Sequence, residues 1–160
     1  DSWKFYWDEL PGDKYLHYVP NANHGLLGSY QTQNIFSFYH RLIYNEELPR
    51  MKWKIENGTF YITVDKHIPH EISLWTINNS SSRDFRIWQV GRNWKKESVQ
   101  QNNDSGTYKI QAPNKDGYTA SLVEIVFYPE SENPLVLSTG TCVLPDVYQH
   151  PRYTSEKANK

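Results

Sequence analysis

Cysteine is almost absent from this sequence, which contains Cys142 alone among 160 residues. A single thiol excludes an internal disulfide and a zinc site built from cysteines, so Cys142 could pair only with a partner outside the chain. Long hydrophobic runs are also lacking. None approaches the roughly 20 apolar residues that a membrane-spanning helix needs, and no membrane insertion is expected. The chain opens on Asp1 rather than on Met, without a signal peptide, so we expect a fragment or a processed product.

The sequence also lacks an excess of either basic or acidic residues. The chain has 17 basic and 18 acidic residues and a formal net charge of −1, so we expect no nucleic-acid partner. The sequence contains one weak candidate for a metal-binding motif. His67 and His70 flank a proline, but only Asp65 and Glu71 lie nearby as further ligands, and the segment is typical of a turn between strands. No metal and no cofactor is therefore expected. Aromatic residues, by contrast, make up 15% of the chain, which indicates a folded protein.

Residues 1–49 have a pattern of helix, strand, loop and helix. A short helix is predicted before Pro11, from the apolar residues Trp3, Tyr6, Trp7 and Leu10. Residues 15–19 are aromatic and β-branched and predict a buried strand. Ser29 is predicted to cap a second helix, whose apolar face would consist of Ile35, Phe38, Tyr39 and Leu42. A unit of this size cannot cover both faces of its strand. We therefore expect the closing edge of a larger α/β sheet.

Residues 50–146 change to a period of two, which is typical of strands. Strands are predicted over residues 60–64, 70–77, 84–89, 106–111, 119–128 and 135–143. Turn residues separate them, as in an antiparallel sandwich of the immunoglobulin-like kind. Residues 147–160 form a polar tail. The predicted fold class is therefore α+β, with the closing edge of an α/β sheet followed by a β-sandwich.

His24 lies in the Asn-rich loop between the predicted strand and the second helix. Because an imidazole titrates near neutral pH, a histidine in such a loop is suited to general base catalysis. A surface histidine without a function is the other interpretation. The 160 residues contain no Gly-x-Ser-x-Gly sequence, so His24 has no nucleophile of that type within the chain.

Tryptophans suggest a different function, because a β-sandwich with exposed indole rings can stack on sugars. Trp75 is predicted on the less apolar face of its strand, and the other candidates are Trp53, Trp88 and Trp94. Packing of these rings in the core, or against a missing part of the protein, is the alternative. A carbohydrate-binding module therefore stays open as a second alternative.

Four Asn-x-Ser/Thr sequences indicate N-glycosylation and an extracellular location. They begin at Asn57, Asn78, Asn79 and Asn103, and each lies where a turn is expected. Because Asn78 and Asn79 are adjacent, only one of the two is expected to carry a sugar. We expect a secreted glycoprotein.

Several segments carry a resemblance to a known family. They are DSWKFYWDELPGDKYLHYVPNANHGL, HEISLWTINNSSSRDFR, DGYTASLVEIVFYP and the ending TGTCVLPD. Together they resemble the PhoPQ-activated pathogenicity-related protein family, over nearly the whole chain up to about residue 148. The resemblance implies a secreted α/β-hydrolase domain followed by a β-sandwich, and eukaryotic members include a secreted signal that slows cell division.

The resemblance implies that His24 takes the place of the histidine in a hydrolase catalytic triad. The acid and the nucleophile would then lie upstream of Asp1, so the chain alone is expected to be inactive. Two functions follow, since a fold does not settle function. One is an extracellular signal that represses proliferation through a cell-surface receptor. The other is a secreted serine hydrolase, of the esterase or peptidase type. In both, the partner of residues 1–49 would be the rest of their own α/β domain.

Overall fold

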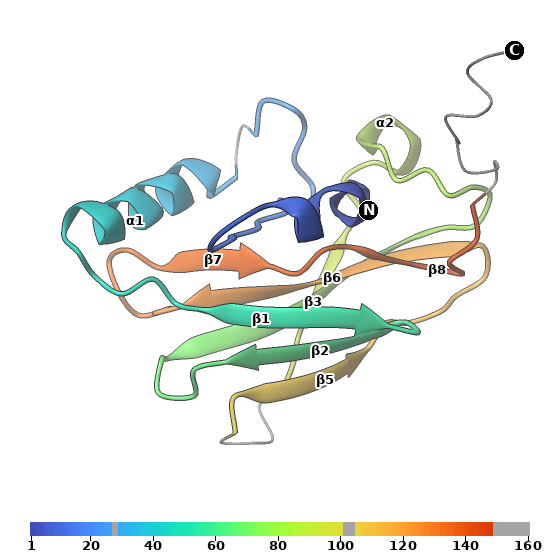
Figure 1. The fold of residues 1–160 in the computed structure, drawn as a ribbon. Coiled ribbons are helices and arrows are strands. Elements are labelled where there is room, and N and C mark those ends of the chain that lie inside the picture. Colours follow the sequence, from blue (N-terminus) through green and yellow to red (C-terminus); the bar gives the residue numbers. More distant parts are fainter. Residues whose placement is uncertain (27–28, 101–104, 149–160) are drawn as a thin grey trace, which may run out of the picture.

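The structure, a computed structural model, describes residues 1–26, 29–100 and 105–148 (Figure 1). Over these residues the fold is α+β, with antiparallel strands predominating over a few helices. The strands are β1 Met51–Glu56, β2 Thr59–Val64, β3 His70–Asn79, β4 Lys95–Ser98, β5 Thr107–Gln111, β6 Tyr118–Phe127, β7 Leu135–Ser138 and β8 Cys142–Leu144. The helices are α1 Gln31–Ile43, the single turn α2 Ile87–Val90, and the 3₁₀ helices η1 Ser2–Phe5 and η2 Trp7–Glu9.

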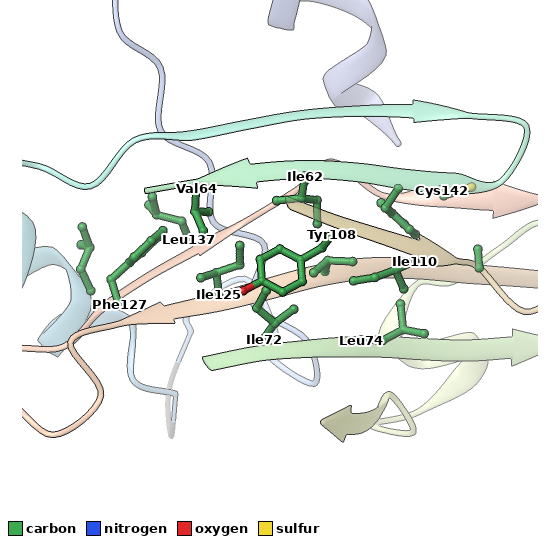
Figure 2. Packing of buried hydrophobic residues seen from close by; sticks show 14 residues of the cluster. Ile62, Val64, Ile72, Leu74, Tyr108, Ile110, Ile125, Phe127, Leu137 and Cys142 are labelled. Carbon is green, nitrogen blue, oxygen red and sulfur yellow. The ribbon is translucent and has the colours of Figure 1, made fainter. Parts of the chain in front are cut away.

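The described strands form two antiparallel sheets. One has the order β1-β2-β5, and the other has the order β4-β3-β6-β7, with β8 also paired to β6. Alternation along β2 places Phe60, Ile62 and Val64 inward, as the period of two predicts. These side chains meet residues of the second sheet, including Ile125 and Phe127, in one hydrophobic cluster (Figure 2). The two sheets therefore share one core.

The hairpin between β1 and β2 shows how a local sequence sets the register. Glu56 pairs with Thr59, so Asn57 and Gly58 form a two-residue turn. Their φ angles are +48° and +77°, in the left-handed region that Asn and Gly adopt most readily. The strand before this turn, β1, was not among the predicted strands, although Met51, Trp53 and Ile55 alternate with charged residues along it.

Two strand predictions are wrong in detail. The predicted strand over residues 84–89 is instead a turn followed by α2. The Asp84 carboxylate accepts a hydrogen bond from the backbone N–H of Arg86 at 3.1 Å and also binds its guanidinium, which bends the chain. The predicted strand over residues 135–143 divides into β7 and β8. The Thr139 hydroxyl accepts the Val123 N–H at 3.0 Å and replaces a ladder bond at the break.

The first helix prediction is also wrong in detail, because residues 2–9 form two 3₁₀ turns. Their indoles pack onto the β1–β2–β5 sheet. Trp3 lies edge-on to Trp53 with ring centroids 4.9 Å apart, and Trp7 stacks on the same ring at 5.5 Å. The Trp3 indole N–H also donates to the Thr141 carbonyl at 2.9 Å. The N-terminal segment is thus held on the two-sheet part by aromatic contacts.

Residues 15–19 are extended but belong to neither ladder, contrary to the predicted strand. They run beside β7, at the edge of the second sheet. The Ser138 N–H donates to the Leu16 carbonyl at 2.7 Å, and the Tyr18 N–H donates to the Ser138 hydroxyl at 2.8 Å. Among the described residues, the segment joins the second sheet through Ser138.

Helix α1 is amphipathic, as predicted, but its polar side packs inward. Asn34, Ser37 and Arg41 are 8%, 2% and 7% exposed. The apolar residues on the other sides are largely exposed, and they include Ile35, Phe36, Tyr39, Leu42 and Ile43. Phe38 is the exception, since it packs edge-on against Tyr15 at 5.3 Å. The helix lies beside β7 (Figure 1).

The Asn34 side chain explains why a polar residue faces inward. Its Oδ1 accepts the Val136 N–H at 2.6 Å, and its Nδ2 donates to the Val136 carbonyl at 2.9 Å. The carboxamide thereby completes the hydrogen bonds of an edge strand, as another strand would. Among the described residues, none of the helices has the length and apolar character that crossing a bilayer requires.

Candidate functional site

The structure places His24 on an exposed loop between the extended segment and α1. Its imidazole makes no hydrogen bond or ion pair with another described residue. No described carboxylate or hydroxyl is in position to act with it. The arrangement of extended segment, loop and helix agrees with the predicted order of elements. Catalysis by His24 is not tested by this geometry and stays a prediction.

The loop that carries His24 is attached to the two-sheet part by Asn21. The Asn21 Nδ2 donates to the Trp94 carbonyl at 3.0 Å, and its Oδ1 accepts the Trp94 N–H at 3.0 Å. Asn21 has a φ angle of +60°, which Asn tolerates better than most residues. The pair of bonds fixes the start of the loop, three positions before His24. The contact between Asn21 and Trp94 was not among the predictions, although Asn21 directly follows Pro20 in the sequence.

A buried polar group lies beside this loop, on the outer face of the second sheet. Glu124, 7% exposed, accepts a hydrogen bond from the Lys96 ammonium at 2.7 Å. His17 faces the same group. Its Nδ1 accepts the Asn34 Nδ2 at 3.0 Å, because the Asn34 oxygen is already held by Val136. Neutral His17 therefore carries its proton on Nε2.

Burial sets the protonation of His17. Loss of solvent lowers the pKa of the imidazole below its ordinary value, and this effect outweighs the opposing influence of the Glu124 carboxylate and of the hydrogen bond to the Gln31 side chain. His17 is therefore neutral at pH 7. Neither His17 nor Glu124 was predicted as a site residue, since a lone histidine in a strand-like segment gives no recognisable signal.

The segment with His67 and His70 is a turn, as predicted. The His70 ring lies 2.6 Å from the Ile68 carbonyl through Nδ1 and 2.7 Å from the Tyr108 hydroxyl through Nε2. His67 is exposed, and its N–H donates to Asp65 at 2.9 Å. In the part of the chain that the structure describes, no three His, Cys, Asp or Glu side chains group as metal ligands would.

The glycosylation candidates lie in unlike surroundings. Asn57 is exposed at the tip of the β1–β2 turn, and its carboxamide makes no hydrogen bond to a described residue. The Asn78 Nδ2 has three acceptors, at 3.0 to 3.2 Å. Asn79 donates to Ser82 and to the Asp84 carbonyl and accepts three further bonds. Asn103 lies outside the described residues.

The tryptophans do not form one flat surface. Trp53 is covered by two other indoles, and Trp94 packs in a second, smaller hydrophobic cluster. Trp88 is 71% exposed on α2, with the Arg86 guanidinium over its ring at 5.0 Å. Trp75 has the Lys96 ammonium over its ring at 5.6 Å. Sugar binding by these rings stays a prediction.

Cys142 is a free thiol, 6% exposed, in the core between the sheets (Figure 2). Burial raises its pKa, so the reactive thiolate is disfavoured. A disulfide to an outside partner would need this strand to leave the core.

Comparison with known proteins gives a relative and a family. Autocrine proliferation repressor protein A of Dictyostelium discoideum is 37% identical over 102 residues, which cover 54% of this chain and 20% of that protein. The chain thus spans about a fifth of the length of this curated relative. No solved structure matches the chain. The model of the PhoPQ-activated pathogenicity-related protein family matches residues 1–86, more than half of the sequence. The chain belongs to the PhoPQ-activated pathogenicity-related protein family.

Proposed function

We propose that this chain is the C-terminal region of a longer secreted protein that represses cell proliferation as an extracellular signal. The observation that carries the proposal is the 37% identity to a protein named autocrine proliferation repressor, over 102 residues. An autocrine factor must leave the cell that makes it, so the proposal includes secretion and a receptor at the cell surface. The four candidate glycosylation sites support the same location.

The finer fold assignment belongs to this proposal. Residues 1–49 are taken as the closing edge of an α/β-hydrolase-like domain, and residues 50–146 as an immunoglobulin-like β-sandwich. Helix α1 supports the first part, because Phe36 and Ile43 are 67% and 74% exposed on its apolar side. A contiguous apolar surface of this kind usually marks a contact surface. The extended residues 15–19, with few backbone partners, fit an edge that pairs with an upstream strand.

The partner of this surface is therefore the upstream part of the same protein. The relative is about five times the length of the matched segment, which provides a body large enough to cover α1. In that arrangement Ile35, Tyr39 and Leu42 pack against the α/β domain, while Asn34 and Arg41 keep their contacts with the two-sheet part. Each side of the helix then has a partner suited to its polarity.

A secreted serine hydrolase is the alternative function, with His24 as its general base. The exposed loop after an extended segment is the feature that favours it. Under the main proposal, His24 is a remnant of the fold and contributes nothing to signalling. The two functions therefore differ in what the substitution His24→Ala does.

Deletion of the gene in the source cells, followed by addition of purified full-length protein, tests the proposal. Deletion should shorten the population doubling time, and the added wild-type protein should restore it. The His24→Ala protein should restore it equally. If the wild-type protein slows growth and a folded His24→Ala protein does not, the hydrolase function gains support. If neither slows growth, the repressor function is wrong.

A further inference from the structure

A hollow of about 560 Å³ lies between the outer face of the second sheet and the segment that precedes α1. Its size is within the range of small-molecule sites. Val126 and Val136 supply an apolar surface from β6 and β7, and Val19 and Pro20 face them from the extended segment. The hollow is therefore bounded by residues of the second sheet and of the segment before α1, and the Asn21 bonds to Trp94 attach that segment to the chain near β4.

Positive charge predominates among the ionised side chains that line the hollow. Lys96 and Glu124 form an ion pair at 2.7 Å and compensate each other. Arg92 also lines the hollow, is exposed, and makes no hydrogen bond or ion pair with a described residue. Its guanidinium therefore leaves one positive charge in excess at this place.

Hydrogen-bond donors also line the hollow. The Lys96 ammonium has three N–H groups, of which Glu124 takes one, and its side chain is 44% exposed. The Arg92 guanidinium adds five donors. His17 also lines the hollow, but both of its ring nitrogens have protein partners, Asn34 at Nδ1 and Gln31 at Nε2. The surroundings thus fit an acceptor-rich anionic group next to an apolar body.

We propose that this hollow binds a small organic carboxylate with an apolar body. The carboxylate lies toward Arg92 and Lys96, and the apolar body lies on Val126 and Val136. The inference is independent of the proposed signalling function, because it rests on the lining of the hollow alone. It names a chemical class that both a signalling protein and a hydrolase could recognise.

Three isosteric probes test the charge preference: phenylacetate, 2-phenylethanol and phenethylamine. Each is titrated into the ¹⁵N-labelled 160-residue chain while the amide resonances of Val126 and Val136 and the Trp75 indole resonance are followed. Phenylacetate should bind with a Kd of about 1 mM, as expected for a ligand of its size. Phenethylamine should bind at least about tenfold more weakly, because it meets the excess positive charge.

Two variants test the named residues without disturbing buried groups. Arg92→Gln removes the unpaired guanidinium, and Gln33→Glu adds a carboxylate to an exposed lining position on α1. Each should weaken phenylacetate binding about fivefold. The matched control is Lys95→Gln, because Lys95 is the neighbour of Lys96 on β4 and does not line the hollow. The control should change the Kd less than about twofold.

Equal affinity for the three probes, tighter binding of the amine, or shifts that do not saturate would overturn the proposal. Wild-type affinity in Arg92→Gln would overturn the placement of the carboxylate. The same titration on the proposed longer protein tests whether the hollow is open there as well. If phenylacetate binds the 160-residue chain and not the longer protein, the hollow is covered by upstream residues and is not a ligand site.

Discussion

His17 is a neutral, desolvated imidazole, and this gives the protein a pH dependence with a defined sign. Because its pKa is lowered in the folded state, the unfolded chain binds more protons between that lowered pKa and the ordinary value near 6.5. Stability should therefore rise with pH through this window and fall as the pH drops below about 7. In the folded state the Glu124 carboxylate and Gln31 favour the imidazolium, but desolvation outweighs them.

The substitution His17→Gln should flatten this dependence. Urea unfolding of the chain at pH 7, 6 and 5 measures the free energy of unfolding at each pH. The wild-type value should decline over this series more steeply than the value for His17→Gln. The exposed His67 provides the control, and His67→Gln should keep the wild-type slope. A His17→Gln protein with an unchanged slope would show that His17 is not the group responsible.

Asn57 and Asn79 should differ as glycosylation sites, although each begins an Asn-x-Ser/Thr sequence. Asn57 projects from a turn with a free carboxamide, whereas the Asn79 amide holds the loop that leads to Asp84. A glycan replaces one of the hydrogens on that amide. We expect sugar on Asn57 and none on Asn79 in secreted material. Peptide mass mapping after glycosidase treatment in heavy-oxygen water marks each used asparagine, and the reverse pattern would contradict this account.

At the scale of elements, α1 should show the reverse of the usual sensitivity to substitution. Asn34→Ala removes the carboxamide that satisfies both backbone groups of Val136 and should cost about 1–3 kcal/mol. Phe36→Gln should change the stability of the chain by less than about 0.5 kcal/mol, since Phe36 is exposed. Urea unfolding measures both values. A larger loss for Phe36→Gln than for Asn34→Ala would mean that α1 packs the other way round.

Sequence patterns predicted most of the strands, because more and less buried positions alternate in β2 and β5, and because β3 and β6 are long runs rich in apolar residues bounded by turn residues. Strand prediction from these patterns failed where side chains form hydrogen bonds with the backbone. The Asp84 carboxylate makes a turn that competes with a strand, and the Thr139 hydroxyl replaces a ladder bond. Such local bonds leave little trace in hydrophobic periodicity. The break at residue 139 in particular could not be read from the apolar residues around it.

The candidate site was less predictable than the fold. His24 was found because its loop resembles a known motif, but the Asn21 bonds to Trp94 join residues 73 positions apart. The Lys96–Glu124 ion pair also joins residues that are distant in the chain, since it links β4 to β6 across β3. Contacts of this kind join segments that are distant in the chain, and hydrophobic periodicity does not show how such segments are aligned. Helix α1 was predicted as amphipathic, but its hydrophobic pattern did not indicate that the side with Asn34 would be the one that faces β7.

At the scale of the whole molecule, the proposed function requires α1 to form an interface with the upstream part of the protein. Hydroxyl-radical footprinting tests this directly, by comparing the longer secreted protein with the 160-residue chain. Phe36 and Ile43 should be oxidised readily in the short chain and be strongly protected in the longer protein. Trp88, 71% exposed on α2, is the internal control and should react equally in both. Equal oxidation of Phe36 and Ile43 in the two proteins would contradict the account.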